Sequence, residues 1–91
     1  FANYRTRMDD IDDKIMELLA RRMEISREMG MVKRENGYTV FQPSRYNDTM
    51  ERCAAYCAGK NLDAEAVKSI FEAIHSESIR QQLRIVNENN E

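Results

Sequence analysis

The chain has 91 residues, enough for one domain and too few for two, because domains cluster at roughly 100–150 residues. Hydrophobic residues make up 42% and charged residues 33%, which excludes a disordered chain, and no apolar run approaches the ~20 residues of a membrane span. Its 14 basic and 16 acidic side chains leave a net charge of −2, which excludes an overall attraction to nucleic acid or anionic membranes. One soluble folded domain is predicted, and neither nucleic acid nor a membrane is predicted as its partner.

The first predicted element is a helix over about 2–35. Its apolar residues recur in steps of three and four, as on one helical face, at Tyr4, Met8, Ile11, Ile15, Leu18, Ile25, Met29 and Val32. Such a helix is a rod of roughly 50 Å, whereas a globule of this chain length is only about 31 Å across. The projecting apolar stripe needs a partner, which predicts an intertwined homodimer, with a long helix in a larger parent protein as the alternative.

Two shorter helices follow. Pro43 suits the first turn of a helix over about 43–58, because its fixed φ matches a helix start. Gly59 stands where a left-handed cap ends that helix, and Asp63 is a suitable N-cap for a third helix over about 63–86. No strand is predicted, so the fold class is all-α with three helices per chain.

The residue types of metal and covalent chemistry are sparse. Cys53 and Cys57 are the only cysteines and His75 is the only histidine, without metal-ligand spacing around them. Reduced structural thiols in a cytoplasmic protein are therefore predicted. Four aspartates crowd residues 9–13, where a solvated helix face is a simpler interpretation than a metal site. The sequence predicts no cofactor, no metal and no nucleophile–base pair.

Polar side chains stand where apolar ones belong on the two long helices. Arg22 interrupts the apolar stripe of the first helix, and Lys33 lies within roughly 20° of it on the helix wheel. Ser78 and Gln82 continue the apolar face of the third helix. A buried Arg needs an anion, either a protein carboxylate or a ligand, and structural polar groups remain the alternative interpretation. Together the four residues indicate a polar ligand pocket inside a helical bundle.

The combined pattern resembles the all-helical, AroQ-type chorismate mutases. The similarity covers nearly the whole chain and rests on Arg5, residues 11–23, residues 30–33, Val40, Arg45, residues 70–74, Ser78 and Gln82. Residues 41–46 and 72–78 are similar to the mutase domain that some bacteria fuse to DAHP synthase. A chain that begins at Phe1 is therefore expected to be one mutase domain, residues 1–91, excised from a longer bifunctional protein.

The resemblance implies the rearrangement of chorismate to prephenate, for phenylalanine and tyrosine biosynthesis, in an intertwined homodimer without a cofactor. It implies that Arg22 binds one substrate carboxylate and that Arg5, reaching across from the partner subunit, binds the other. It further implies that Lys33 and Gln82 contact the ether oxygen of the bond that breaks. A fixed cation and an amide donor stabilise negative charge that develops on such an oxygen.

The resemblance places Arg45 and Ser78 at the carboxylate end of the substrate and its surrounding network. Gln42 and Tyr46 depart from the family pattern, since many relatives have Asp and Glu there, and that Glu accepts a hydrogen bond from the substrate's ring hydroxyl. Tyr46 or Gln42 is expected to make this contact, or the contact is lost. Two other functions stay open: a noncatalytic prephenate-binding regulatory module of a fused DAHP synthase, and an isochorismate–pyruvate lyase on the same scaffold.

Overall fold

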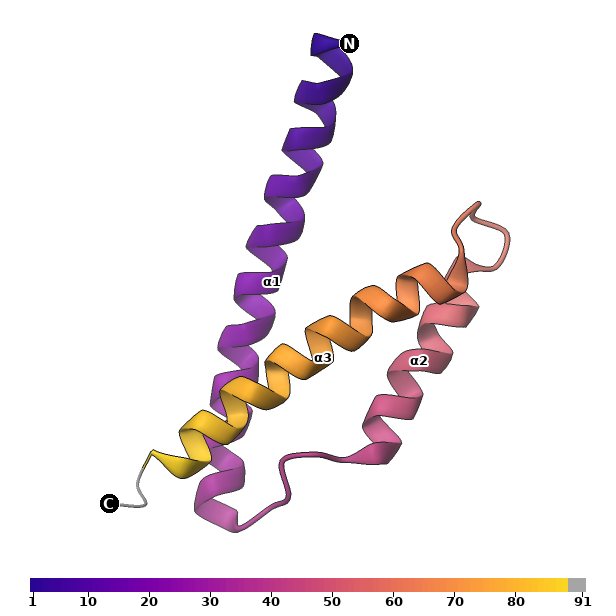
Figure 1. The fold of residues 1–91 in the computed structure, drawn as a ribbon. Coiled ribbons are helices and arrows are strands. Elements are labelled where there is room, and N and C mark those ends of the chain that lie inside the picture. Colours follow the sequence, from indigo (N-terminus) through magenta and orange to yellow (C-terminus); the bar gives the residue numbers. More distant parts are fainter. Residues whose placement is uncertain (89–91) are drawn as a thin grey trace.

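Three helices make up the computed structural model, which describes residues 1–88 (Figure 1). Helix α1 spans Ala2–Asn36, α2 spans Pro43–Cys57 and α3 spans Ala64–Asn87. Each helix begins and ends within one residue of the bounds expected from the sequence. The described residues contain no strand, so the all-α fold class is confirmed. No helix among them is both long and apolar enough to cross a membrane.

Local sequence accounts for the helix ends. Gly37 ends α1 with φ 69°, and Gly59 follows α2 with φ 72°, a left-handed conformation that costs glycine least. Pro43 opens α2, where its missing N–H has no helical partner to lose. The side chain of Asp63 accepts a hydrogen bond from the backbone N–H of Ala66 at 3.3 Å, which caps α3 as expected.

The chain is elongated because α1 is much longer than the other two helices. Helix α3 packs against both α1 and α2, and it crosses the C-terminal half of α1 while the N-terminal half projects alone (Figure 1). The chain measures 54 × 28 × 14 Å, with a radius of gyration of 16.3 Å, whereas a globule of this length has about 12 Å. The expected projection of the first helix beyond its own domain is therefore observed.

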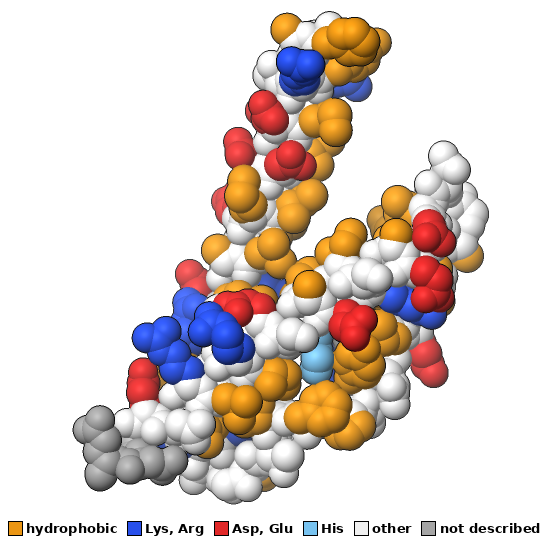
Figure 2. Space-filling model, viewed as in Figure 1, with side chains coloured by type: hydrophobic (Ala, Val, Ile, Leu, Met, Phe, Trp, Pro, Cys, Tyr) orange, Lys and Arg blue, Asp and Glu red, His pale blue; other side chains and the backbone are white. Residues whose placement is uncertain are grey.

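The projecting half of α1 carries its apolar side chains in the open. Figure 2 shows them gathered along this arm of the molecule. Six of them are 50–63% exposed, namely Tyr4, Met8, Ile11, Ile15, Met16 and Leu18. A continuous apolar surface of this kind marks an interaction site rather than a surface adapted to water.

The face of α1 that packs against α3 is not the predicted apolar stripe. Its buried residues are Met23, Ser26, Gly30 and Lys33. The later part of the stripe stays 43–56% exposed, at Ile25, Met29 and Val32. Side-chain size explains why this face, and not the apolar stripe, packs against α3. Even a Cβ on Gly30 would lie 3.2 Å from the Cα of Gln82. The two helices thus meet through small residues that let their backbones approach closely.

Replacing Gly30 by Ala tests this close approach. Ala favours an isolated helix by up to about 1 kcal/mol, but its methyl group would meet the α3 backbone at 3.2 Å. Because backbone cannot move aside cheaply, we expect Gly30→Ala to lower the free energy of unfolding by about 1–3 kcal/mol. Thermal unfolding at fixed protein concentration measures the change, with Ser76→Ala on the exposed surface of α3 as the control. A midpoint at or above that of the parent chain would contradict the packing described.

Candidate active site

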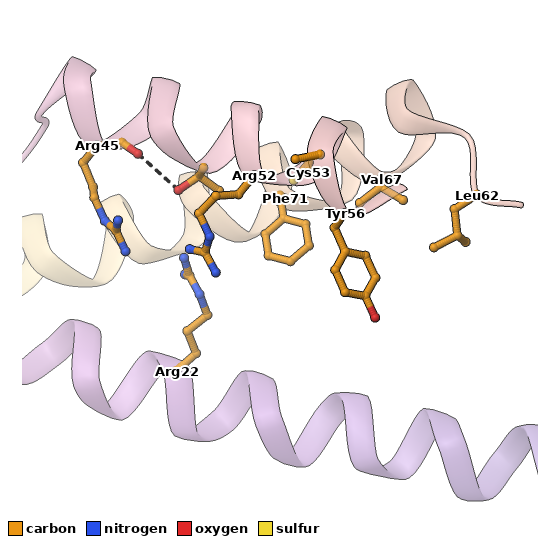
Figure 3. Close-up of a pocket in the computed structure, with 10 residues that line it drawn as sticks. Arg22, Arg45, Arg52, Cys53, Tyr56, Leu62, Val67 and Phe71 are labelled. Carbon is orange, nitrogen blue, oxygen red and sulfur yellow. Dashed lines mark hydrogen bonds between the residues drawn. The ribbon is translucent and has the colours of Figure 1, made fainter. Parts of the chain in front are cut away.

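Three guanidinium groups converge between α1 and α2. Arg22 extends from α1 toward Arg52 of α2, and Arg45 of α2 lies beside them (Figure 3). All three line one cavity of about 720 Å³. Both ion pairs found within residues 1–88 join neighbours on α3, so no carboxylate of the described chain forms an ion pair with the three cations. An anion from outside the chain would satisfy them.

The surroundings of Arg22 disfavour its positive charge. Partial burial lowers its pKa, and the positive charges of Arg45 and Arg52 lower it further. Arginine nevertheless keeps its proton in proteins. The repulsion therefore persists in the free chain and is relieved when a negatively charged ligand enters.

The remainder of the cavity is mostly apolar, so the cavity has a cationic end and an apolar end. Its other lining residues are Thr49, Cys53, Ala55, Tyr56, Leu62, Val67 and Phe71. The hydroxyl of Thr49 donates to the backbone carbonyl of Arg45 at 3.1 Å, the dashed line in Figure 3. Cys53 and its neighbour Cys57 are buried free thiols. No group of three potential metal ligands occurs among residues 1–88.

A second set of buried polar side chains joins α1, the following loop and α3. Lys33 Nζ donates to the carbonyl of Val40 at 2.8 Å and to Oε1 of Gln82 at 2.7 Å. The amide Nε2 of Gln82 donates to the hydroxyls of Ser26 at 3.0 Å and Ser78 at 3.1 Å, and these hydroxyls also bond to each other. All four side chains are at most 9% exposed, so the network fixes their orientations.

Lys33 is a buried cation whose hydrogen-bond partners are both neutral. Desolvation by burial lowers its pKa, since removal from water disfavours the charged form. An ammonium group has three donors, and two of them are used here. The third has no acceptor among the described residues, so it is available to negative charge on a ligand, for which a preorganised cation is worth more than in water.

The family model of type II chorismate mutases matches residues 4–83. The chain belongs to the type II chorismate mutase family. It is 26% identical over 83 residues to a chorismate mutase of Methanocaldococcus jannaschii, covering 89% of this chain and 84% of the relative. Against a 4-amino-4-deoxychorismate mutase of Streptomyces venezuelae the identity is 25% over 76 residues, covering 84% and 74%.

A further relative is a bifunctional protein. The chain is 30% identical over 78 residues to the chorismate mutase/prephenate dehydratase of Escherichia coli K12. The match covers 86% of this chain but only 20% of that relative, so the mutase-like part is one segment of a longer protein there. No solved structure gives a significant match.

In this chorismate mutase family member, five predicted site residues fall into the two groups described. Arg22 and Arg45 line the cavity, and Lys33, Ser78 and Gln82 belong to the buried network. The structure thus brings together residues that lie far apart in the sequence, because α3 returns across α1.

The other three predicted residues lie elsewhere. Tyr46 is half-buried in the first turn of α2. Gln42 is exposed at the N-cap position of α2, with Nε2 at 3.5 Å from the carbonyl of Thr39. Arg5 is on the projecting arm of α1, roughly 26 Å along the helix axis from Arg22, and therefore does not reach the cavity of its own chain.

Two residues of this arrangement escaped the sequence analysis. Ser26 lies one turn beyond Arg22, and Arg52 lies two turns beyond Arg45. Helical spacing would have found both, because residues separated by four or seven positions share a face. A small hydroxyl on a long helix has no distinctive signal of its own, so residue type alone does not single out Ser26.

Ser26→Ala tests whether the buried network orients the amide of Gln82. The change removes one of its two acceptors, and a single hydrogen bond is worth about 0.5–1.5 kcal/mol. We expect kcat with chorismate to fall roughly 2- to 10-fold while KM changes little, because the loss affects alignment rather than substrate binding.

The matched control is Ser69→Ala, which removes an exposed hydroxyl that donates to the carbonyl of Glu65 on α3. It should leave both kinetic constants unchanged. Thermal unfolding of both variants separates alignment from loss of fold. An unchanged kcat in Ser26→Ala would exclude Ser26 from orienting the amide.

Proposed function

We propose that the chain catalyses the rearrangement of chorismate to prephenate, a step of phenylalanine and tyrosine biosynthesis that needs no cofactor. The observation that carries this proposal is a cavity with three cations and no paired carboxylate, in a chain of the type II chorismate mutase family. Chorismate has two carboxylates, and its ether oxygen gains negative charge as the carbon–oxygen bond breaks. Positioning and electrostatic stabilisation are sufficient for such a unimolecular step.

The cationic end of the cavity is assigned to carboxylate binding. Arg22 and Arg45 hold carboxylate oxygens through guanidinium forks, which fix the direction of a bound carboxylate as well as its place. Arg52 adds a third positive charge to this end. Ser78 contributes from the buried network, where its hydroxyl accepts a hydrogen bond from Gln82. Holding the substrate in its compact conformer lowers the entropic part of the barrier.

The buried network is assigned to the ether oxygen. Lys33 directs its remaining ammonium hydrogen to this atom, while its other two hydrogens hold Val40 and Gln82. Both amide hydrogens of Gln82 are directed at serine hydroxyls in the free chain. Gln82 therefore donates to the ether oxygen by exchanging one serine acceptor for the substrate.

The ring hydroxyl of the substrate is assigned to the start of α2. Tyr46 is half-buried there and offers a phenolic oxygen. Gln42 is exposed one turn earlier, so its amide remains in contact with water and contributes less. These residues stand where many relatives have the Glu and Asp of the family pattern.

We further propose that two copies of the chain form an intertwined homodimer. The exposed apolar arm of α1 and the apolar end of the cavity are complementary surfaces that a two-fold arrangement buries together. In this arrangement Arg5 of one copy enters the site of the other and binds the second carboxylate. The same residue is far from Arg22 within one chain, which supports the exchange.

The parent protein is proposed to be a fusion with DAHP synthase, on the similarity of residues 41–46 and 72–78. Bifunctional arrangement is known for the Escherichia coli relative, whose name joins a mutase to a prephenate dehydratase. The two buried free thiols fit a reducing compartment, which supports a cytoplasmic location.

Incubation with chorismate, followed by loss of its diene absorbance and by assay for prephenate, tests the proposed reaction. We expect turnover, and Arg22→Ala should lower it by roughly 10²–10³-fold, the scale for removing one preorganised contact. Arg84→Ala on the exposed side of α3 is the control. Pyruvate release from isochorismate without prephenate formation would indicate a lyase, and absence of any turnover would indicate a binding module.

Mixing two inactive variants tests the exchange of Arg5. In a heterodimer of Arg5→Ala with Arg22→Ala, one site combines the intact Arg22 of the first chain with the intact Arg5 of the second. Random reassociation should restore roughly a quarter of the parent activity, since half of the dimers are mixed and each has one complete site.

Each variant alone should stay inactive under the same treatment, which is the control. If Arg5 acts within its own chain, no mixed dimer has a complete site. A mixture that stays inactive although sedimentation shows mixed dimers would therefore refute the exchange.

A further inference from the structure

We propose that His75 is a substrate-contacting residue, whose Nε2 forms the buried hydrogen bond to the ring hydroxyl. The inference rests on the proposed function and names a group that the sequence analysis left without a role. It assigns to α3 a contact that sequence similarity had placed on α2 alone.

The first observation is an unsatisfied buried atom. Within residues 1–88, Nε2 of His75 is the one buried side-chain nitrogen or oxygen without a hydrogen-bond partner. Part of the side chain remains accessible, and its edge is visible in Figure 2 as the chain's single histidine. Leaving a buried polar atom unpaired is unfavourable, because the atom has lost its hydrogen bonds to water. A ligand that supplies the missing partner recovers that loss on binding.

The second observation is that the ring of His75 is held in place. Its centroid lies 4.8 Å from the ring centroid of Tyr46 and 5.6 Å from that of Phe41, the latter in an edge-on contact of 70°. Aromatic pairs at these separations are attractive beyond their buried area. Residues of the loop and of α2 thus fix the direction in which the imidazole of α3 presents its nitrogen.

The third observation places His75 on the same face of α3 as the buried network. It precedes Ser78 by one helical turn and Gln82 by two turns, so the three share a face of α3. Burial lowers the pKa of His75, and the charges of Arg22 and Lys33 lower it further. The imidazole is therefore neutral at neutral pH and offers one donor and one acceptor nitrogen.

The chemistry of the substrate decides which group His75 contacts. The guanidinium groups meet the carboxylates, and Lys33 with Gln82 meets the ether oxygen. The ring hydroxyl is the remaining polar group of chorismate, and it is neutral, as His75 is. A hydroxyl both donates and accepts, so it pairs with an imidazole nitrogen in either tautomer.

The test compares chorismate with an analogue in which hydrogen replaces the ring hydroxyl. For each protein, the ratio of kcat/KM for chorismate to kcat/KM for the analogue is divided by the ratio of the two uncatalysed rates. The quotient is the preference that is due to recognition by the protein. We expect the parent chain to prefer chorismate by about tenfold or more, and His75→Leu to reduce this preference by about threefold or more, with the phenol of Tyr46 still in place. His75→Gln, which keeps a donor and an acceptor, should retain part of the preference.

Two controls separate contact from structure. Tyr46→Phe keeps the ring against His75 but removes the phenolic oxygen proposed to share the hydroxyl, so it should retain part of the preference for chorismate. A purely structural role of His75 would make His75→Leu lower both substrates equally and leave the preference unchanged, which would overturn the proposal. Where His75→Leu does not fold, His75→Met serves for the same comparison.

The remaining outcomes are also decisive. Loss of the preference in Tyr46→Phe but not in His75→Leu would assign the hydroxyl to the phenol and overturn the role of His75. A parent chain that turns over chorismate without any preference would overturn this inference and leave the proposed function standing. A parent chain that does not turn over chorismate would overturn both.

Discussion

The structure depends on the close crossing of α1 and α3 at Gly30. Only at this separation can Lys33 reach Gln82, with 2.7 Å between Nζ and Oε1, and Ser26 reach the same amide at 3.0 Å. A larger residue at position 30 would press on the α3 backbone. The crossing that joins α1 and α3 therefore also sets the positions of Lys33, Ser26 and Gln82, so the packing of the helices and the alignment of these polar groups depend on the same contact.

Positive charge without carboxylate partners is the second organising feature. Lys33 pairs with neutral acceptors, and no carboxylate among the described residues pairs with the three arginines of the cavity. An internal carboxylate would stabilise the free chain but compete with the substrate. Leaving these charges unpaired keeps them available for a dianion. Burial lowers the pKa values of Arg22 and Lys33, and the charges of Arg45 and Arg52 lower the pKa of Arg22 further.

The single chain leaves two apolar surfaces open, the projecting arm of α1 and one end of the cavity. Burial of both by a second copy would complete the site at the same time as the fold, because Arg5 lies on that arm. Assembly and substrate binding would then be linked through the same helix. A dimer of this kind would explain how a chain with so few buried residues supports a cavity with preorganised charges.

The sequence by itself determined the three helices and pointed to residues that lie in the cavity and in the buried network. Local signals suffice for ends such as Gly37 and Asp63, since caps depend on neighbouring backbone, and polar residues on apolar faces singled out Arg22, Lys33, Ser78 and Gln82. Tertiary structure alone decided which face of α1 meets α3, because close packing follows size at Ser26 and Gly30 rather than hydrophobicity. It also decided that His75 Nε2 is buried without a partner, since burial of one atom depends on Phe41 and Tyr46, which local periodicity does not place.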